Sequence, residues 1–240
     1  MNKIIKINKT FPQTKLTEFG LRVYNSLVEN FSRTYFVGGT VRDFLLGKNI
    51  KDIDIATSAT PQQAAETLKK YFIDCNIGFV NMGVVIATDG VHNATVATLR
   101  QDLKSSSRYP KIKFVEDAKT DAKRRDFTIN SLYFSVKEGK ILDFFGGTGD
   151  LKRKKIKFIG QPEKRIKEDP LRIIRAFRFA LGLNFKLESR TKKAVKSNFQ
   201  LVKQLTKSKI GKEIQKLKNK SHQSIIKNIL DNPKLLDKYF

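Results

Sequence analysis

Cysteine and histidine are scarce in this 240-residue chain, which has a single cysteine, Cys75, and two histidines, His92 and His222. One thiol cannot form an internal disulfide, so no disulfide framework is expected and the chain suits a reducing compartment. A structural zinc site needs four cysteine or histidine ligands, and only three such residues are present. The sequence therefore excludes a disulfide-stabilised fold and a Cys/His zinc site.

Long apolar runs are also missing. No stretch approaches the roughly 20 apolar residues that span a bilayer. The first eleven residues, MNKIIKINKTF, contain lysines but no continuous apolar region of signal-peptide length. We therefore expect a soluble, cytoplasmic protein with no membrane partner.

Acidic residues are few relative to basic ones, with 23 Asp+Glu against 48 Lys+Arg and a formal net charge of +25. A positive field of this size favours a polyanionic partner, with nucleic acid as the first candidate and an anionic membrane surface as the second. The alternative is a lysine-rich, solvated surface without any specific partner. The apolar content of 40% supports a packed core, and the length fits one large or two small domains.

Hydrophobic periodicity and turn residues divide the chain into a mixed first part and a helical second part. In the first part we expect helices at 15–31, 40–46, 60–72 and 119–131, and strands at 34–38, 52–56, 83–88, 94–100, 111–116, 132–136 and 141–145. Strand signals stop after 156–159, and helices are expected at 163–182, 188–198, 208–219 and 221–230. The polar segment 101–110 is expected to form a mobile loop. These patterns predict an α+β fold with one domain over 1–152 and a second, all-helical domain over 153–240.

Two aspartates in an apolar run, Asp52 and Asp54, are the first candidate site residues. Successive strand side chains point to opposite faces, so both aspartates point one way while Ile53 and Ile55 enter the core. Two carboxylates on an exposed face near a strand end can hold a divalent metal through oxygen. The alternative is that they only border a solvated strand.

Paired glycines and an arginine shortly before the aspartates favour a phosphate site. Gly38 and Gly39 let a ligand approach the backbone closely, where a side chain would block it. The helix expected to begin at Thr40 has free N–H groups that attract phosphate. Together with Arg42, these residues predict a site for a metal ion and a phosphate group.

A second cluster follows at 124–130, with the sequence Arg-Arg-Asp-Phe-Thr-Ile-Asn. The adjacent arginines Arg124 and Arg125 suit phosphate or ribose contacts. Asp126 could orient an arginine or meet a ribose hydroxyl, and Asn130 is expected one helical turn further on the same face. The alternative is a solvated helix face with one side-chain pair.

A third cluster at 168–178 contains Asp169 and Arg172, three residues apart at the start of an expected helix that has Pro170 in its first turn. An acceptor beside a fork of donors matches the Watson–Crick edge of cytosine or adenine, whereas uracil and guanine place a carbonyl where the amino group should be. Arg175 and Arg178 follow Arg172 along the same expected helix and could reach phosphates. The alternative is a capped helix with a surface ion pair, which adds little stability.

Five motifs in this order resemble those of class II tRNA nucleotidyltransferases, the CCA-adding enzymes of bacteria and eukaryotes, and of the related bacterial poly(A) polymerases. The resemblance covers about residues 34–180. Its motifs are Gly38-Gly39-Thr40-Val41-Arg42-Asp43, Asp52-Ile53-Asp54, Arg124-Arg125-Asp126, Asp143 with Gly146-Gly147 and Asp150, and Glu168-Asp169-Pro170-Leu171-Arg172.

The resemblance implies a polymerase-β-like nucleotidyltransferase head followed by a helical neck. It also implies transfer of C and A nucleotides from CTP and ATP to the 3′ end of tRNA by a two-metal mechanism, with Asp52 and Asp54 as the catalytic residues and the ligands of Mg²⁺. In the family, positions matching Gly39 and Arg42 contact phosphates. The predicted nucleotide-binding residues are Gly38, Gly39, Arg42, Arg125, Asp126, Asn130, Asp169, Arg172, Arg175 and Arg178. The third catalytic carboxylate is open between Glu116 and Asp117.

Family members usually continue through helical body and tail domains, whereas this sequence ends at Phe240 and keeps only Glu213 of a further neck motif. We therefore expect a truncated form whose grip on tRNA comes from the lysines of 186–220, from a second copy in a homodimer, or from a partner chain. The alternatives are an enzyme that adds only CC, only A or a poly(A) tail, a non-catalytic RNA-binding remnant, and a small-molecule nucleotidyltransferase.

Overall fold

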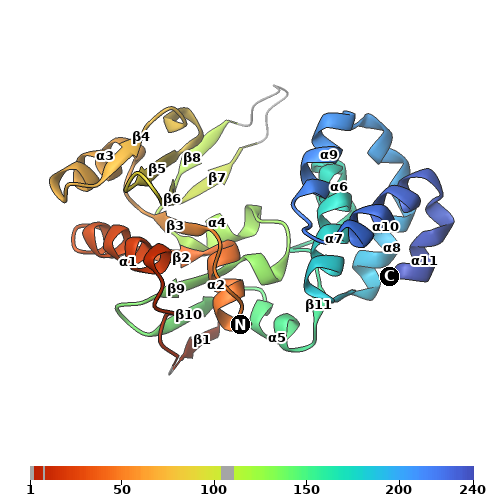
Figure 1. Cartoon of the computed structure of the whole chain (residues 1–240), viewed down its shortest axis with the longest axis horizontal. Coiled ribbons are helices and arrows are strands. Elements are labelled where there is room, and N and C mark those ends of the chain that lie inside the picture. The colour runs from red at the N-terminus through yellow and green to blue at the C-terminus, as the bar shows by residue number, and fades with distance from the viewer. Residues whose placement is uncertain (1–2, 8, 104–110) are drawn as a thin grey trace. The chain divides into compact units, whose positions relative to one another are not determined.

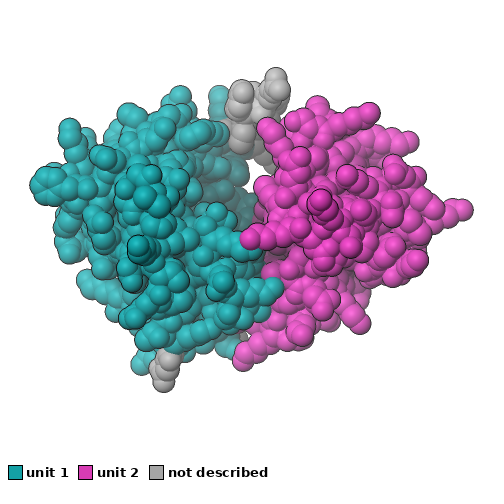
Figure 2. Space-filling view, viewed as in Figure 1, with its two compact units in different colours: residues 1–125, 130–147 teal, residues 126–129, 148–240 magenta. Residues whose placement is uncertain are grey.

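The computed structural model describes residues 3–7, 9–103 and 111–240, and the chain divides into two compact units. The first unit comprises residues 1–125 and 130–147, and the second comprises 126–129 and 148–240 (Figure 2). The expected domain boundary at 152/153 thus differs by five residues from this division, and the segment 126–129 was not expected in the second unit. The assignment of the two parts as head and neck domains stays a prediction.

The first unit is built on a sheet that has eight strands among the described residues, in the order β1-β10-β9-β2-β3-β6-β5-β4 (Figure 1). Neighbouring strands are antiparallel except β3 and β6, which run parallel. The strands are β1 (Lys3–Lys6), β2 (Thr34–Val37), β3 (Ile53–Thr57), β4 (Asp74–Asn76), β5 (Val84–Thr88), β6 (Asn93–Thr98), β9 (Leu132–Ser135) and β10 (Lys140–Asp143). A separate pair is formed by β7 (Arg100–Asp102) and β8 (Ile112–Phe114).

Helices of the first unit cover both faces of this sheet. They are α1 (Lys15–Val28), α2 (Gly38–Leu45), α3 (Pro61–Lys70), α4 (Ala118–Arg124) and the 3-10 turn η1 (Val80–Met82). The 3-10 turn η2 (Thr128–Asn130) has its first two residues in the second unit and Asn130 in the first. Phe36 stacks on Tyr24 of α1 with ring centroids 5.2 Å apart, on one face. The next residue along the strand, Val37, packs with Ala118 and Ala122 of α4 on the other. This alternation is the period-2 pattern of a sheet buried on both sides.

The second unit is helical apart from a short parallel pair of strands, β11 (Lys155–Ile156) and β12 (Lys186–Leu187). Its helices are α5 (Gly147–Lys152, whose first residue belongs to the first unit), α6 (Pro162–Glu168), α7 (Leu171–Leu183), α8 (Ser189–Ser197), η3 (Phe199–Gln204), α9 (Lys207–Gln215), α10 (Lys220–Asp231), η4 (Pro233–Leu235) and α11 (Leu236–Tyr239). The centre of the unit is α7, which contacts α6, α9 and α10 and buries Phe177 against Phe240. The predicted α+β class, a mixed sheet with helices followed by a helical part, is confirmed.

Two predicted helices were wrong in extent. The helix expected over 119–131 ends at Arg124, because Arg125 is extended and Phe127 forms a bridge with Phe158. The helix expected over 163–182 is two helices, α6 and α7, separated at Asp169-Pro170. A residue before proline is sterically disfavoured in the helical region, and Asp169 has φ −152° and ψ 98°.

Two further expectations concern loops and membranes. The predicted mobile loop at 101–110 begins inside β7, and its residues 104–110 lie outside the described residues. Among the helices that the structure describes, none combines the length and the apolar character needed to cross a bilayer.

Candidate active site

Asp52 and Asp54 flank the first residue of β3, beside the start of α2. Ile53 and Ile55 are 1% and 0% exposed and belong to the core, so Asp54 lies on the opposite face of the strand, as the sequence predicted. The glycine turn faces the carboxylate, because a Cβ added at Gly38 would lie 3.4 Å from Asp54 Oδ2. Gly38 also has φ +64°, a conformation that glycine adopts without steric cost.

Thr40 connects this turn to the aspartates, and the sequence reasoning gave it no role. Its buried hydroxyl donates to the Asp52 carbonyl at 2.9 Å and accepts from the Asp54 amide at 2.8 Å. Pairing between β2 and β3 stops at Phe36 and Ile55, since the chain leaves the sheet at Gly38 to form α2. Beyond Ile55, β2 no longer pairs with the backbone of Asp52 and Asp54. The Thr40 hydroxyl makes hydrogen bonds to these backbone groups instead.

The electrostatics of Asp54 reflect burial and two opposing sets of charges. Burial raises the pKa of Asp54, the Arg125 guanidinium lowers it, the Asp52 carboxylate raises it again, and Arg42 and the Gly39 amide lower it. The net pKa lies above its ordinary value. The two arginines therefore do not fully offset burial and the neighbouring carboxylate, and such an environment favours an additional cation.

Arg42 of α2 is held by two other side chains. Its Nε and Nη2 donate to the two carboxylate oxygens of Asp43, each at 2.9 Å, and its Nη1 donates to Asn130 Oδ1 at 2.9 Å. A Cβ on Gly39 would lie 3.6 Å from Arg42 Nη2. The guanidinium therefore lies beside the glycine turn, where the sequence predicted a phosphate contact.

Arg125 enters the same site from the end of α4. Its Nε donates to the Tyr133 hydroxyl at 2.9 Å, and its Nη2 lies 3.2 Å from Asp121 Oδ2. Its Nη1 is 3.4 Å from the position of a Cβ on Gly38. Burial lowers the pKa of Arg125, but Tyr133 and Asp121 outweigh this effect and the pKa is raised. The arginine therefore stays charged next to Asp54.

Asp52 and Asp54 supply two carboxylates, so a divalent metal held there would need further oxygen ligands from outside the chain. No group of three or more His, Cys, Asp or Glu side chains with the geometry of a metal site occurs in the part of the chain that the structure describes. Magnesium commonly binds through one or two carboxylates together with substrate phosphates and water. The raised pKa of Asp54 and the position of Arg42 and Arg125 beside the glycine turn are compatible with that pattern.

Both candidates for a third carboxylate are engaged elsewhere. Glu116 pairs with Arg33 at 2.5 Å on the exposed surface. Asp117 caps α4, accepting hydrogen bonds from the amides of Lys119 and Thr120. Their contacts therefore give neither residue a place beside Asp52 and Asp54.

Asp126 does not share a helix face with Asn130, which corrects the expectation from their spacing. Asp126 belongs to the second unit, where its carboxylate accepts from Arg175 Nε at 2.8 Å and also from Arg175 Nη2. Asn130 belongs to the first unit and accepts from Arg42. Asp126 therefore holds an arginine, one of the two roles that the sequence left open, while the ribose contact stays a prediction.

Asp169 and Arg172 stand at the start of α7 and contact different partners. The Asp169 carboxylate accepts from the Leu171 amide at 3.1 Å. Arg172 Nη1 donates to the Arg165 carbonyl at 2.7 Å and pairs with Glu168 at 3.1 Å. Each side chain is therefore held by its own neighbours rather than by the other.

Glu213 contacts both Arg175 and Arg178. The sequence identified it only as the remaining residue of a neck motif. It is 5% exposed, and its carboxylate lies 2.8 Å from Arg178 Nε and 3.7 Å from Arg175 Nη1. Arg178 also covers the Phe179 ring, 4.0 Å from its centroid. The contact spans two helices, α7 and α9, so no local spacing could have revealed it.

The predicted site residues thus form two groups, one in each unit. The first unit brings together Gly38, Gly39, Arg42, Asp52, Asp54, Arg125 and Asn130. The second holds Asp126, Asp169, Arg172, Arg175 and Arg178, of which Asp126, Arg175 and Arg178 share a network with Glu213. The residues that sequence reasoning missed, Thr40, Asp43, Asp121 and Tyr133, all act by holding another site residue.

The sequence of this chain resembles those of known proteins. The profile of the poly A polymerase head domain matches residues 34–157, which include all predicted residues of the first unit. A CCA-adding enzyme from Lactobacillus delbrueckii subsp. bulgaricus is 40% identical over 215 residues, and one from Lactococcus lactis subsp. lactis is 36% identical over 217. These matches cover 89% and 90% of this chain but 52% of each relative, so the chain spans about half the length of the curated relatives it matches.

Solved structures show the same fold. The CCA-adding enzyme of Bacillus stearothermophilus in complex with CTP superposes with a TM-score of 0.75 and 33% identity over 85% of this chain and 49% of that one. A tRNA nucleotidyltransferase bound to a primer tRNA and an incoming ATP analogue gives a TM-score of 0.68 and 32% identity, over 84% and 58%. The predicted nucleotidyltransferase fold is confirmed by these neighbours, and so is the resemblance to class II tRNA nucleotidyltransferases. The chain belongs to the family of the poly A polymerase head domain.

Proposed function

We propose that this chain carries the nucleotidyl-transferring centre of a CCA-adding enzyme, which extends the 3′ end of tRNA with C and A nucleotides from CTP and ATP. One observation carries the proposal. In the segment that matches the family, the half-buried Asp54 carboxylate, which has the exposed Asp52 close by in the sequence, lies against a glycine turn flanked by Arg42 and Arg125. A binding module needs no such carboxylate pair, and the net charge of +25 suits an RNA substrate better than a small molecule.

The residues of the first unit act by positioning and by charge. Asp52 and Asp54 would hold Mg²⁺, which, when bound, supplies charge neutralisation at the triphosphate and activation of the RNA 3′-hydroxyl. Arg42 presents N–H donors to phosphate oxygens beside Gly39, where no side chain blocks the approach. Arg125 stands between Asp54 and the Asp121–Tyr133 pair. In this proposal it donates a hydrogen bond to a ribose or phosphate oxygen of the nucleotide. Catalysis of this kind depends on orientation and electrostatic stabilisation more than on a protein base.

The second unit supplies the choice of base in this proposal. Asp169 offers an acceptor and Arg172 a fork of donors, matching the edge of cytosine or adenine. Glu168 and the Arg165 carbonyl hold the Arg172 guanidinium, which is 14% exposed, so its plane is set before a nucleotide arrives. Arg175 and Arg178, held by Asp126 and Glu213, are assigned to the triphosphate.

Nucleotide omission on an unfinished tRNA tests the function directly. With tRNA lacking its 3′ CCA, CTP, ATP and magnesium, we expect extension by C, C and A. Without ATP the product should stop after two C residues, and without CTP nothing should be added. Addition of only CC, only A or a run of A would assign one of the partial activities, whereas magnesium-independent RNA binding without any incorporation would make the chain a non-catalytic RNA binder and overturn the proposal.

The Asp52→Asn variant provides the matching loss of function. Removing one charge from the carboxylate pair should lower the rate of incorporation at least about a hundredfold, the scale expected when one stabilising group of a transition state is removed. Binding of tRNA should change little, because the positive charge lies elsewhere. The control is Glu66→Gln, which removes an exposed carboxylate of α3 and should leave the rate unchanged. Full activity of the Asp52 variant would show that the carboxylate pair is not the reaction centre.

A further inference from the structure

Asp43 makes an unusual contact with its direct neighbour in α2. Its two carboxylate oxygens accept from Nε and Nη2 of Arg42, each at 2.9 Å, which is the planar bidentate geometry of a strong charge-assisted pair. Adjacent residues of a helix do not face each other, so both side chains must bend to meet. The side chains of Arg42 and Asp43 are 12% and 18% exposed, so water competes little for the contact. This contact fixes the plane of the Arg42 guanidinium.

A second side chain holds the same guanidinium from a distant part of the sequence. Asn130, at the end of η2, is 7% exposed and accepts from Arg42 Nη1 at 2.9 Å. A carboxylate on one edge and a carboxamide on another leave Arg42 little freedom to rotate. Ordering a long arginine side chain costs rotamer entropy, and here the fold meets that cost before any ligand binds.

The held guanidinium is placed at the glycine turn. Arg42 follows Gly39 by three residues, so its side chain leans back over the first turn of α2. A Cβ on Gly39 would lie 3.6 Å from Arg42 Nη2 and 3.9 Å from Asp54 Oδ2. The arginine, the backbone of the turn and the catalytic carboxylate therefore border the same small space.

We infer that Asp43, assisted by Asn130, is a positioning residue that sets the orientation in which Arg42 receives the triphosphate of the incoming nucleotide. The inference rests on the proposed function. Asp43 touches neither the nucleotide nor the metal in this account, and it acts only through Arg42. The competing explanation is that the pair merely stabilises α2, in which case its loss lowers the melting temperature and leaves nucleotide affinity intact.

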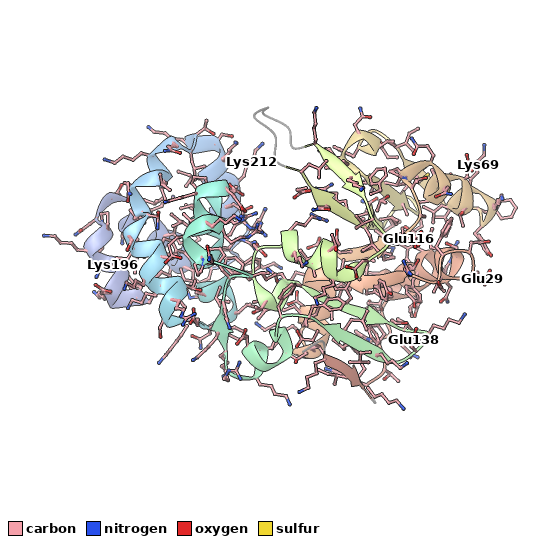
Figure 3. The ribbon with its side chains drawn as sticks, turned by 180° about the vertical axis from the view of Figure 1, so that it is seen from behind. Glu29, Lys69, Glu116, Glu138, Lys196 and Lys212 are labelled. Carbon is pink, nitrogen blue, oxygen red and sulfur yellow. The ribbon has the colours of Figure 1, made fainter. Side chains whose placement is uncertain are left out.

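The Asp43→Asn variant separates these explanations. We expect the KM for CTP and ATP and the Kd for inorganic tripolyphosphate to rise about tenfold, the lower end of the effects seen when a residue supporting a ligand-binding group is removed. The kcat should fall less than about threefold, since the arginine is still present. The matched control is Glu138→Gln, an exposed carboxylate of the β9–β10 hairpin labelled in Figure 3, which should change none of these values. If Asp43→Asn fails to fold, the Asn130→Ala variant tests the inference instead. We then expect a smaller rise in the KM for CTP and ATP and in the Kd for tripolyphosphate.

A double-mutant cycle tests whether Asp43 works through Arg42. The Arg42→Ala and Arg42→Ala/Asp43→Asn variants should have the same KM and the same tripolyphosphate Kd, because the second change has nothing left to misalign. Additive losses, or a lower melting temperature with unchanged affinity, would overturn the inference while leaving the wild-type activity and the proposed function in place. A wild-type protein that neither binds tripolyphosphate nor transfers nucleotides would instead overturn the proposed function and the inference with it.

Discussion

Asp121 lies outside the proposed active site but holds one residue of that site, Arg125. The carboxylate is 1% exposed, pairs with Arg124 at 2.8 Å and Arg125 at 3.2 Å, and accepts from the Tyr133 hydroxyl. Burial raises the pKa of Asp121, but Arg125, Arg124 and the hydroxyl outweigh that effect, so the pKa lies below its ordinary value. The charged form is therefore the one that the folded protein stabilises.

The Asp121→Asn variant should lose about 3 kcal/mol in the free energy of unfolding at pH 7, because a buried arginine is left without its counter-charge. Since the folded pKa of Asp121 is depressed, its contribution is complete above the unfolded value near 3.9 and disappears as the pH falls through the folded value. The difference between wild type and variant should thus be constant from about pH 5 to 8 and shrink below about pH 4. Urea unfolding at several pH values measures it.

Asp74→Asn serves as the control for this experiment. Asp74 is an exposed aspartate of β4 in the same unit, and its replacement should leave the unfolding free energy nearly unchanged at every pH. An Asp121→Asn difference that grows toward low pH would contradict the assignment of Asp121 as a charged, paired group.

At the scale of elements, the turn from β2 into α2 depends on one backbone conformation. Gly38 has φ +64°, where a side chain costs about 1–2 kcal/mol. Gly38→Ala should lower the unfolding free energy by that amount. Its Cβ would also reach within 3.4 Å of Arg125 Nη1 and Asp54 Oδ2, so we expect nucleotide transfer to fall as well. Urea unfolding and the incorporation assay measure the two effects.

Gly90 provides the matched glycine for this comparison. It has φ +86° in the β5–β6 hairpin, and nothing lies within 4 Å of its Cβ position. Gly90→Ala should carry a similar cost in stability without any loss of transfer. Equal activities for the two variants would show that the space beside Gly38 is not used by the reaction.

The bounds of helices could be predicted where neighbouring residues determine them. They were predicted wrongly where contacts between distant residues determine them. The helices beginning at Lys15 and Pro61 were found because their caps and apolar spacing are local. The helix after Ala118 was predicted too long, because Asp126 leaves it to bind Arg175, 49 residues away. Likewise the glycine turn and the paired aspartates were found from short spacings, whereas the Asn130 contact with Arg42 depends on packing across 88 residues.

At the scale of the whole molecule, charge is the property that most clearly implies a partner. The excess of +25 includes many lysines in α8, α9 and α10 of the second unit, several of them exposed. Charge of this kind binds a phosphate backbone by releasing counterions and carries no base information. Under the proposed function, selection of C and A would depend on Asp169 and Arg172, while affinity for RNA would come from the lysine-rich helices.

Replacing Lys209 and Lys212 of α9 by glutamine should therefore weaken tRNA binding without changing the order of nucleotides added. Both side chains are exposed and three residues apart on one helix face. For each lysine that binds a phosphate, its replacement should reduce the slope of log affinity against log salt by about 0.7–0.9. The matched control is Lys69→Gln/Lys70→Gln on α3 of the first unit (Lys69 and Lys212 are labelled in Figure 3), which removes the same charge and should leave the slope unchanged. Equal slopes for both pairs of variants would mean that net charge, rather than α9, accounts for the affinity.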